Sequence, residues 1–170
     1  DPASPDPLGE GSHLRDVYLR AVPRYTGRVT VPVLWDTKTN TIVNNESREI
    51  MRMLDLDFEA FATREGSLAP PALRARVDEV LDASDTPVNN GVYRAGFAHS
   101  QAAYEEACRE LFAALDHWDE VLGTQRFLCG DILTEADVAM FTTLLRFDVV
   151  YYAHFKCNLR RLVDYPRLWA

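Results

Sequence analysis

The chain has 170 residues, of which 47% are hydrophobic and 26% charged, a mixture typical of a globular protein that buries a real core. Its net charge of −8 comes without a basic stripe, which argues against nucleic acid or an anionic membrane as a partner. No window approaches the roughly 18 consecutive apolar residues of a membrane span, and three widely spaced cysteines, Cys108, Cys129 and Cys157, indicate reduced thiols and a cytoplasmic location.

The chain is predicted to begin with a helix and a strand. Residues 1–12 lack the basic-then-apolar pattern of a signal peptide, so we expect a disordered lead-in or the scar of a removed segment. Residues 13–25 predict a short amphipathic helix that ends at Pro23. Residues 28–36 are β-branched and apolar and predict a strand, which Pro32 limits to a sheet edge, a strand start or a special turn.

A hairpin and a second helix follow. Residues 41–43 predict a short strand that pairs antiparallel with the first one. Residues 44–47 open a helix, whose apolar face we expect to contain Ile50, Met51, Leu54 and Phe58. The small, proline-rich segment 67–71 then predicts a domain boundary, with one unit at residues 13–66 and a second at residues 67–170.

The second unit is predicted to be entirely helical. Thr134 and Asp137 form a capping-box pattern at the start of one helix, and Pro166 suits the first turn of the last one. The expected helices cover residues 72–81, 100–122, 138–155 and the segment from Pro166, with a break at residues 86–91.

Two short stretches of the first unit form a candidate binding site. A residue before proline is extended, and a cis bond between Val31 and Pro32 would turn the Val31 N–H and C=O outward to pair with an extended peptide. Glu46 and Ser47 stand at a helix start, which favours a ligand carboxylate, while Glu46 itself suits an ammonium group. γ-Glutamyl-cysteinyl-glycine, glutathione, meets these demands. Each stretch alone is more often structural: a proline turn, and an ordinary helix cap.

Five longer motifs connect this edge to the helical half. They are V-T-V-P-V-L-W-D at 29–36, T-I-V-N-N-E-S at 41–47, N-N-G-V-Y-R-A-G-F-A at 89–98, L-T-E-A-D at 133–137 and R-F-D-V-V-Y-Y-A-H-F-K-C-N at 146–158. In content and order they resemble the Xi class of glutathione transferases, the glutathionyl-hydroquinone reductases. The resemblance covers nearly all of the chain after Ser12.

The resemblance implies a mostly α, α+β fold. A partial thioredoxin-like lobe of strand, strand and helix would occupy residues 13–66, and the all-α transferase domain residues 67–170. It also implies a cytoplasmic homodimer that uses glutathione as co-substrate and no metal, and that reduces glutathionylated quinols.

The resemblance further assigns residues to roles. Val31, Pro32, Glu46 and Ser47 would hold glutathione. Tyr93 and Tyr151 would line the quinol side as catalytic phenols, although a tyrosine in either place could also be a core residue with its hydroxyl near the surface.

The sequence departs from the family in one central respect. Family members attack the glutathionyl sulfur with a cysteine in a C-P-W motif on the first strand–helix turn, and no such motif occurs here. The first strand, helix and second strand of the thioredoxin-like domain are also absent, and family chains continue beyond Ala170. The sequence is therefore expected to be a piece of such an enzyme or a natural remnant.

The missing cysteine leaves other readings open. These are a non-catalytic binding or scaffold module, a relative that uses mycothiol, and an ordinary transferase that conjugates glutathione to electrophiles. His154 and Cys157 have a spacing that could suit a metal or a nucleophile pair, but a packed helix end is the stronger interpretation.

Overall fold

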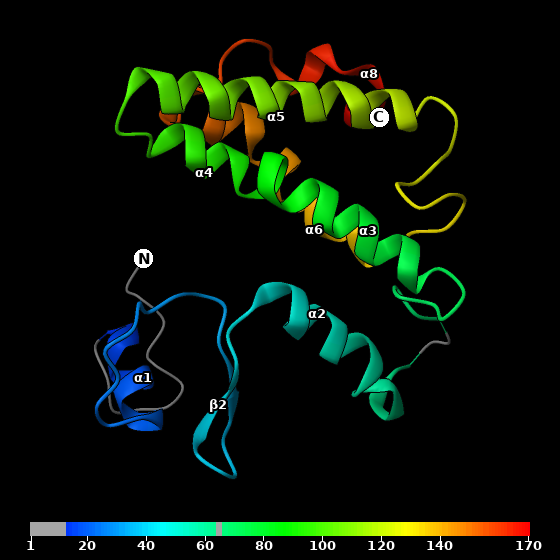
Figure 1. Ribbon diagram of the computed structural model, residues 1–170. Helices are drawn as coiled ribbons and strands as arrows, with labels where there is room; N and C mark the ends of the chain where they lie inside the picture. Colours follow the sequence, from blue (N-terminus) through cyan, green and yellow to red (C-terminus); the bar gives the residue numbers. More distant parts are fainter. Residues whose placement is uncertain (1–12, 64–65) are drawn as a thin grey trace. The chain divides into compact units, whose positions relative to one another are not determined.

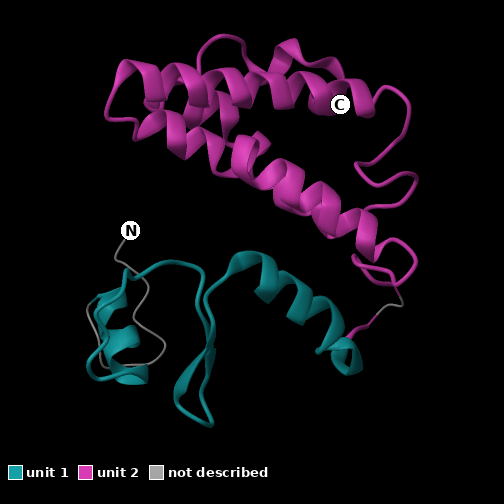
Figure 2. Cartoon of the chain, in the orientation of Figure 1, with its two compact units in different colours: residues 1–61 teal, residues 62–170 magenta. Residues whose placement is uncertain are grey.

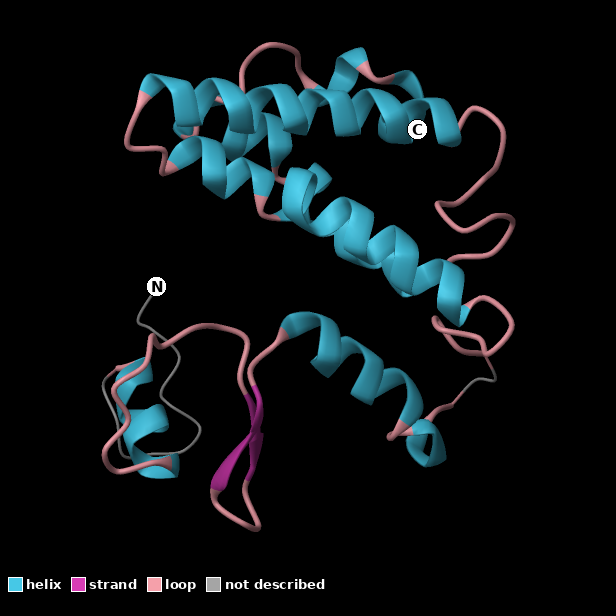
Figure 3. Cartoon of the chain, viewed as in Figure 1, coloured by secondary structure: helices cyan, strands magenta, loops and turns pink. Residues whose placement is uncertain are grey.

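The computed structural model describes residues 13–63 and 66–170, and the chain divides into two compact units on either side of the step from Phe61 to Ala62 (Figure 2). The predicted lead-in at residues 1–12 lies outside the described residues. The first unit holds a small hairpin between helices, and the described part of the second is helical (Figure 3). The predicted fold class, mostly α with a strand–strand–helix lobe, is confirmed.

The first unit follows the predicted order of elements. Its hairpin is antiparallel, with Trp35 opposite Ile42 and Asp36 opposite Thr41. The Asp36 carboxylate accepts hydrogen bonds from the Lys38 N–H and the Thr39 hydroxyl, which closes the turn between the strands. The elements are α1 (Leu14–Ala21), β1 (Leu34–Asp36), β2 (Thr41–Asn44), α2 (Ser47–Leu56) and the 3-10 turn η1 (Glu59–Phe61).

Two expectations for this unit are wrong. The predicted strand at residues 28–36 is a strand only at its last three residues, because the chain from Arg28 to Val33 has no neighbouring strand to pair with in the described unit. In α2, Ile50 is buried as expected, but Leu54 is exposed; Phe58 lies beyond the end of α2 and is exposed too. The apolar face of α2 is therefore only partly covered within its own unit.

The second unit is organised around one long helix. Its elements are α3 (Arg74–Ser84), η2 (Asp85–Asn89), α4 (Gly91–Gly96), α5 (Gln101–Val121), α6 (Glu135–Leu145), η3 (Phe147–Tyr151), α7 (Tyr152–His154), η4 (Leu162–Asp164) and α8 (Pro166–Trp169). Helix α5 lies between α4 and α8 (Figure 1). Its buried residues recur at helical spacing, at Ala107, Leu111, Leu115 and Trp118, so one stripe of α5 forms the centre of the core.

The predicted break at residues 86–91 is wrong. Segment η2 is a π-helical turn, in which the Asn90 N–H donates to the carbonyl of Asp85 at 2.7 Å. Pro87 lies within it, where a residue without an N–H disturbs the α-helical pattern. A second π turn, η3, interrupts the helix predicted at 138–155. The chain thus stays helical through both places, but each turn is widened.

The predicted capping box at the start of α6 is confirmed. The Asp137 carboxylate accepts hydrogen bonds from the Thr134 N–H at 2.9 Å and the Thr134 hydroxyl at 2.8 Å. Its other oxygen accepts the Leu128 N–H at 2.7 Å, so this carboxylate also fixes the preceding loop. In the described part of the chain, no helix combines the length and apolarity that a membrane crossing needs.

Candidate functional site

Each of the two units holds one group of candidate site residues. In the first unit, the Val31–Pro32 peptide bond is cis, and the Val31 side chain is 76% exposed. Among the described residues, the N–H and C=O of Val31 make no hydrogen bond with another group. These two groups can therefore pair with an extended ligand backbone.

The start of α2 lies at the end of the hairpin. Glu46 is the N-cap residue in extended conformation, and its N–H donates to the Asn44 side-chain oxygen at 2.7 Å. Glu46 and Ser47 are both exposed, and the Glu46 side chain makes no cap hydrogen bond. The carboxylate of Glu46, the hydroxyl of Ser47 and the N–H groups of the first turn are thus available to an amino-acid-like ligand end.

The candidate residues of the second unit are the two predicted phenols. Tyr93 lies on α4 and Tyr151 ends η3, and their hydroxyl oxygens are 3.1 Å apart. Tyr151 is 2% exposed, whereas Tyr93 is 41% exposed. Only Tyr93 can therefore touch a ligand directly, and Tyr151 lies behind it.

Arg146 completes this cluster and was not predicted. Its Nε–H donates to the Tyr151 hydroxyl at 3.0 Å, and its guanidinium lies 5.9 Å from the ring centroid. The Tyr151 oxygen accepts this hydrogen bond and keeps a hydrogen and a lone pair for Tyr93, so either hydroxyl can be the donor between the two phenols. When Tyr151 is the donor, the hydrogen of Tyr93 is free to donate to a ligand. The only sequence signal for Arg146 is its place at the start of the R-F-D motif.

Aromatic rings hold the two phenols in place. Phe155 packs against Tyr93 and Tyr151 with centroid separations of 5.4 and 5.5 Å. Phe97 stacks on Tyr93 at 6.3 Å and is 65% exposed. The exposed phenol is therefore bordered by aromatic surface, which suits a planar aromatic ligand.

Tyr93 is held in its neutral form. Its hydrogen bond with Tyr151 and its partial burial both raise the pKa of Tyr93 above the ordinary tyrosine value. At neutral pH it is consequently a hydrogen-bond donor rather than a phenolate.

None of the three cysteines is placed to act as a nucleophile. All are free and buried. Burial raises the pKa of Cys157 to about 12, and burial also raises the pKa of Cys129. Cys157 packs among the helices, as the structural interpretation of the His154–Cys157 spacing expected. Among the described residues, no group of three or more His, Cys, Asp or Glu side chains could hold a metal ion.

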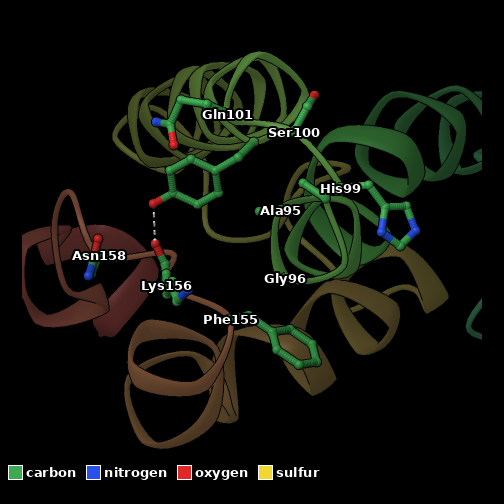
Figure 4. Close-up of a pocket in the computed structure, with 10 residues that line it drawn as sticks. Ala95, Gly96, His99, Ser100, Gln101, Phe155, Lys156 and Asn158 are labelled. Carbon is green, nitrogen blue, oxygen red and sulfur yellow. Dashed lines mark hydrogen bonds between the residues drawn. The ribbon is translucent and has the colours of Figure 1, made fainter.

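A polar cavity of about 400 Å³ lies near this cluster in the second unit (Figure 4). Its lining includes Gln101, Tyr104 and Lys156, and the Tyr104 hydroxyl donates to the Lys156 carbonyl at 2.6 Å. The lining contains neither Tyr93 nor Tyr151 and shares only Phe155 with their surroundings. The cavity is therefore separate from the phenol pair.

Family models match both units. The glutathione S-transferase N-terminal domain matches residues 6–56, and the glutathione S-transferase C-terminal domain matches residues 101–170.

Curated relatives match nearly the whole chain. Glutathionyl-hydroquinone reductase YqjG of Escherichia coli K12 is 50% identical over 168 residues, which are 99% of this chain and 51% of the relative. Glutathionyl-hydroquinone reductase PcpF of Sphingobium chlorophenolicum is 48% identical over 168 residues, which are 99% of this chain and 54% of the relative. The chain thus spans about half the length of the curated relatives it matches.

Solved structures agree with these matches. A Xi class transferase from Natrialba magadii has a TM-score of 0.94 at 55% identity, over 96% of this chain and 50% of the other. The glutathione-bound structure of YqjG from Escherichia coli K-12 has a TM-score of 0.94 at 48% identity, over 99% of this chain and 56% of the other.

Proposed function

Because this chain belongs to the Xi class of the glutathione S-transferase family, we propose that it is part of a glutathionyl-hydroquinone reductase. The observation that carries the proposal is the 3.1 Å contact between the hydroxyls of Tyr93 and Tyr151. It leaves one partly exposed phenol, bordered by aromatic rings, as a donor to a substrate oxygen. Two relatives, YqjG at 50% and PcpF at 48% sequence identity, are named glutathionyl-hydroquinone reductases.

The first unit would bind glutathione. The N–H and C=O of Val31 pair with the cysteinyl part of the tripeptide in the manner of an added strand, and Pro32 keeps this edge in place. The first turn of α2 receives the γ-glutamyl carboxylate through N–H groups and the Ser47 hydroxyl, and Glu46 receives the ammonium group. A glutathione-bound structure among the similar proteins supports this choice of co-substrate.

The reaction proposed is a transfer of the glutathionyl sulfur. A cysteine thiolate attacks that sulfur, the bond between sulfur and ring carbon breaks, and the ring carbon takes the electron pair and a proton to give the hydroquinone. The enzyme is left as a mixed disulfide with glutathione. The thiolate of a second glutathione attacks this disulfide, releases glutathione disulfide and restores the cysteine thiolate. The ring carbon is reduced, and the sulfur that leaves the ring and the thiol sulfur of the second glutathione are oxidised to the disulfide.

Tyr93 would act on the ring oxygen of the substrate. Its hydrogen bond stabilises the negative charge that spreads onto this oxygen as the carbon–sulfur bond breaks. Arg146 and Tyr151 direct that hydrogen bond through their own contacts at 3.0 and 3.1 Å. They are thus positioning residues, while Tyr93 touches the substrate.

We propose that the attacking cysteine is supplied from outside these 170 residues. Cys157 is completely buried with a pKa of about 12, and Cys108 and Cys129 are also buried. A buried neutral thiol cannot reach the substrate. We further propose a cytoplasmic location, since the cysteines are free thiols, as expected in a reducing compartment, and a homodimer, which the family resemblance implies. A monomer in light scattering at micromolar concentration would contradict the dimer.

Affinity chromatography tests the co-substrate. The intact protein is expected to bind glutathione-coupled resin and to elute with free glutathione, whereas a Ser47→Ala variant is retained less. Elution by mycothiol but not by glutathione would reject the glutathione assignment and favour a mycothiol-dependent relative.

A further inference from the structure

One buried hydroxyl in the first unit links both stretches that are proposed to hold glutathione. Tyr18 lies on α1 and is 3% exposed. Its hydroxyl donates to the Thr30 carbonyl at 2.9 Å and accepts the Thr30 N–H at 3.3 Å. It also accepts the Asn45 side-chain N–H at 3.1 Å. Thr30 and Asn45 are 15 positions apart in the chain and meet at this one atom.

Each of these contacts stands next to a proposed glutathione contact. Thr30 directly precedes Val31, and Asn45 directly precedes Glu46. The Asn45 side chain also donates to the Thr30 hydroxyl at 3.1 Å, which joins the two stretches a second time. The position of the Val31 backbone relative to the start of α2 is therefore set by the cluster of Tyr18, Thr30 and Asn45.

The chain around Thr30 has little other support. The β-ladder begins only at Leu34, so no strand partner holds Thr30 in the described unit. The Tyr18 hydroxyl satisfies both backbone groups of Thr30, as a neighbouring strand would do.

The Tyr18 hydroxyl has no capacity left for a ligand. A phenol has one hydrogen and two lone pairs. The Tyr18 hydroxyl donates to the Thr30 carbonyl, accepts the Thr30 and Asn45 N–H groups and also lies 3.3 Å from the Thr30 hydroxyl, so all of them are used. Because the residue is also buried, it acts on a ligand only through Thr30 and Asn45.

We propose that Tyr18 is a positioning residue of the glutathione site: it fixes the spacing between the Val31 backbone and the Glu46–Ser47 helix start, and thereby sets the affinity for the γ-glutamyl-cysteinyl part of the ligand. This inference rests on the proposed function, because it needs glutathione to bind between these two anchors.

The test compares two tyrosine-to-phenylalanine variants in the intact protein by calorimetric titration with glutathione. Tyr18→Phe keeps the ring but removes the hydroxyl with its hydrogen bonds to Thr30 and Asn45, and its Kd is expected to rise about tenfold. Tyr25→Phe is the matched control. Its ring lies 4.9 Å from that of Tyr18, but its hydroxyl donates only to the Arg28 carbonyl. The Kd of this control should change less than about twofold.

A second measurement separates positioning from general stability. Ser47→Ala is made in the wild-type and in the Tyr18→Phe background. If Tyr18 holds the Ser47 end in register, the loss of affinity from Ser47→Ala shrinks in the Tyr18→Phe background. If Tyr18→Phe does not fold, Asn45→Ala tests the same link, and several-fold weaker glutathione binding is expected of it.

The outcomes are distinct. A Tyr18→Phe protein with a lower melting temperature but unchanged Kd overturns the inference and leaves the proposed function intact, as does strict additivity with Ser47→Ala. Failure of the wild-type protein itself to bind glutathione overturns the proposed function, and the positioning role with it.

Discussion

The hydroxyl oxygens of Tyr93 and Tyr151 lie 3.1 Å apart, although the two residues are 58 positions apart in the chain. Both follow or end a π-helical turn: η2 precedes the helix that carries Tyr93, and η3 ends at Tyr151. Such turns often occur at functional sites because they change the direction of a helical side chain. The contact makes one exposed phenol depend on a buried phenol and, through it, on Arg146.

Arg146→Met is expected to lower kcat/KM for a glutathionyl-hydroquinone about tenfold, because the Tyr151 hydroxyl, which contacts the Tyr93 hydroxyl, then loses its hydrogen bond from Arg146. Steady-state kinetics measure this effect, and the Kd for glutathione should stay the same. Arg161→Met is the control, since Arg161 lies 5.2 Å from the ring centroid of Tyr152, which is not in the cluster. Equal losses of kcat/KM in both variants would argue against a role of the hydrogen bonds from Arg146 through Tyr151 to Tyr93.

Gly96→Ala is expected to reduce turnover without weakening glutathione binding. A Cβ at Gly96 would lie 2.4 Å from Cγ of Phe155, so this ring, which packs on both phenols, must move. Gly91→Ala in the same helix is the matched control, because its nearest contact would be an ordinary 3.5 Å from the Thr86 carbonyl oxygen. A Gly96→Ala enzyme with wild-type kcat/KM would show that the position of Phe155 does not matter.

We expect the buried thiol of Cys157 to make the free energy of unfolding fall at alkaline pH. Burial raises its pKa to about 12, so the folded protein binds this proton more tightly than the unfolded chain does. The contribution is fully present below the unfolded thiol pKa of about 8.5 and is lost as the pH rises toward the folded value. Between about pH 8 and pH 10 the free energy of unfolding should fall by roughly 1–2 kcal/mol from this group.

Urea unfolding at these two pH values measures the effect. Cys157→Ala leaves a small cavity and lowers stability at both, but its free energy of unfolding should depend less on pH than that of the wild type. An unchanged pH dependence would mean that another buried group, such as Cys129, whose pKa is also raised by burial, dominates the alkaline loss.

Thr134→Ala is expected to destabilise the second unit by about 0.5–2 kcal/mol, because the buried hydroxyl that bonds to Asp137 is lost. Thr134→Ser keeps this hydroxyl and should retain most of the stability. Chemical denaturation gives both values. A Ser variant as unstable as the Ala variant would assign the effect to the lost methyl group.

Local patterns predicted most of the fold. The hairpin, the long helix α5 and the capping box of α6 follow from turn residues, apolar spacing and a Thr–Asp pair, all of which act over a few positions. The short strand at residues 34–36 was overestimated because strand formation needs a partner, which a local pattern does not reveal. The π turn η2 was missed because Pro87, judged from the local sequence, predicts a break in the helix rather than a widened turn.

The candidate site was predictable only in part. The family resemblance assigned roles to residues of the long motifs, and these roles stay predictions. The roles of Tyr18 and Arg146 depend on particular side-chain hydrogen bonds, to Thr30 and Asn45 and to Tyr151, for which composition and periodicity give no signal. A positioning residue of this kind becomes visible only when the partners of each buried hydroxyl are known.

The most direct test of the central claim is the stoichiometry of the reaction. The intact protein is incubated with a glutathionyl-hydroquinone and glutathione, and hydroquinone and glutathione disulfide are quantified over time. The account predicts that the two products form in equal amounts, that Tyr93→Phe lowers kcat/KM about tenfold to hundredfold, and that Tyr152→Phe changes little. Release of hydroquinone no faster than in the absence of protein, or a Tyr93→Phe variant as active as the wild type, would contradict it.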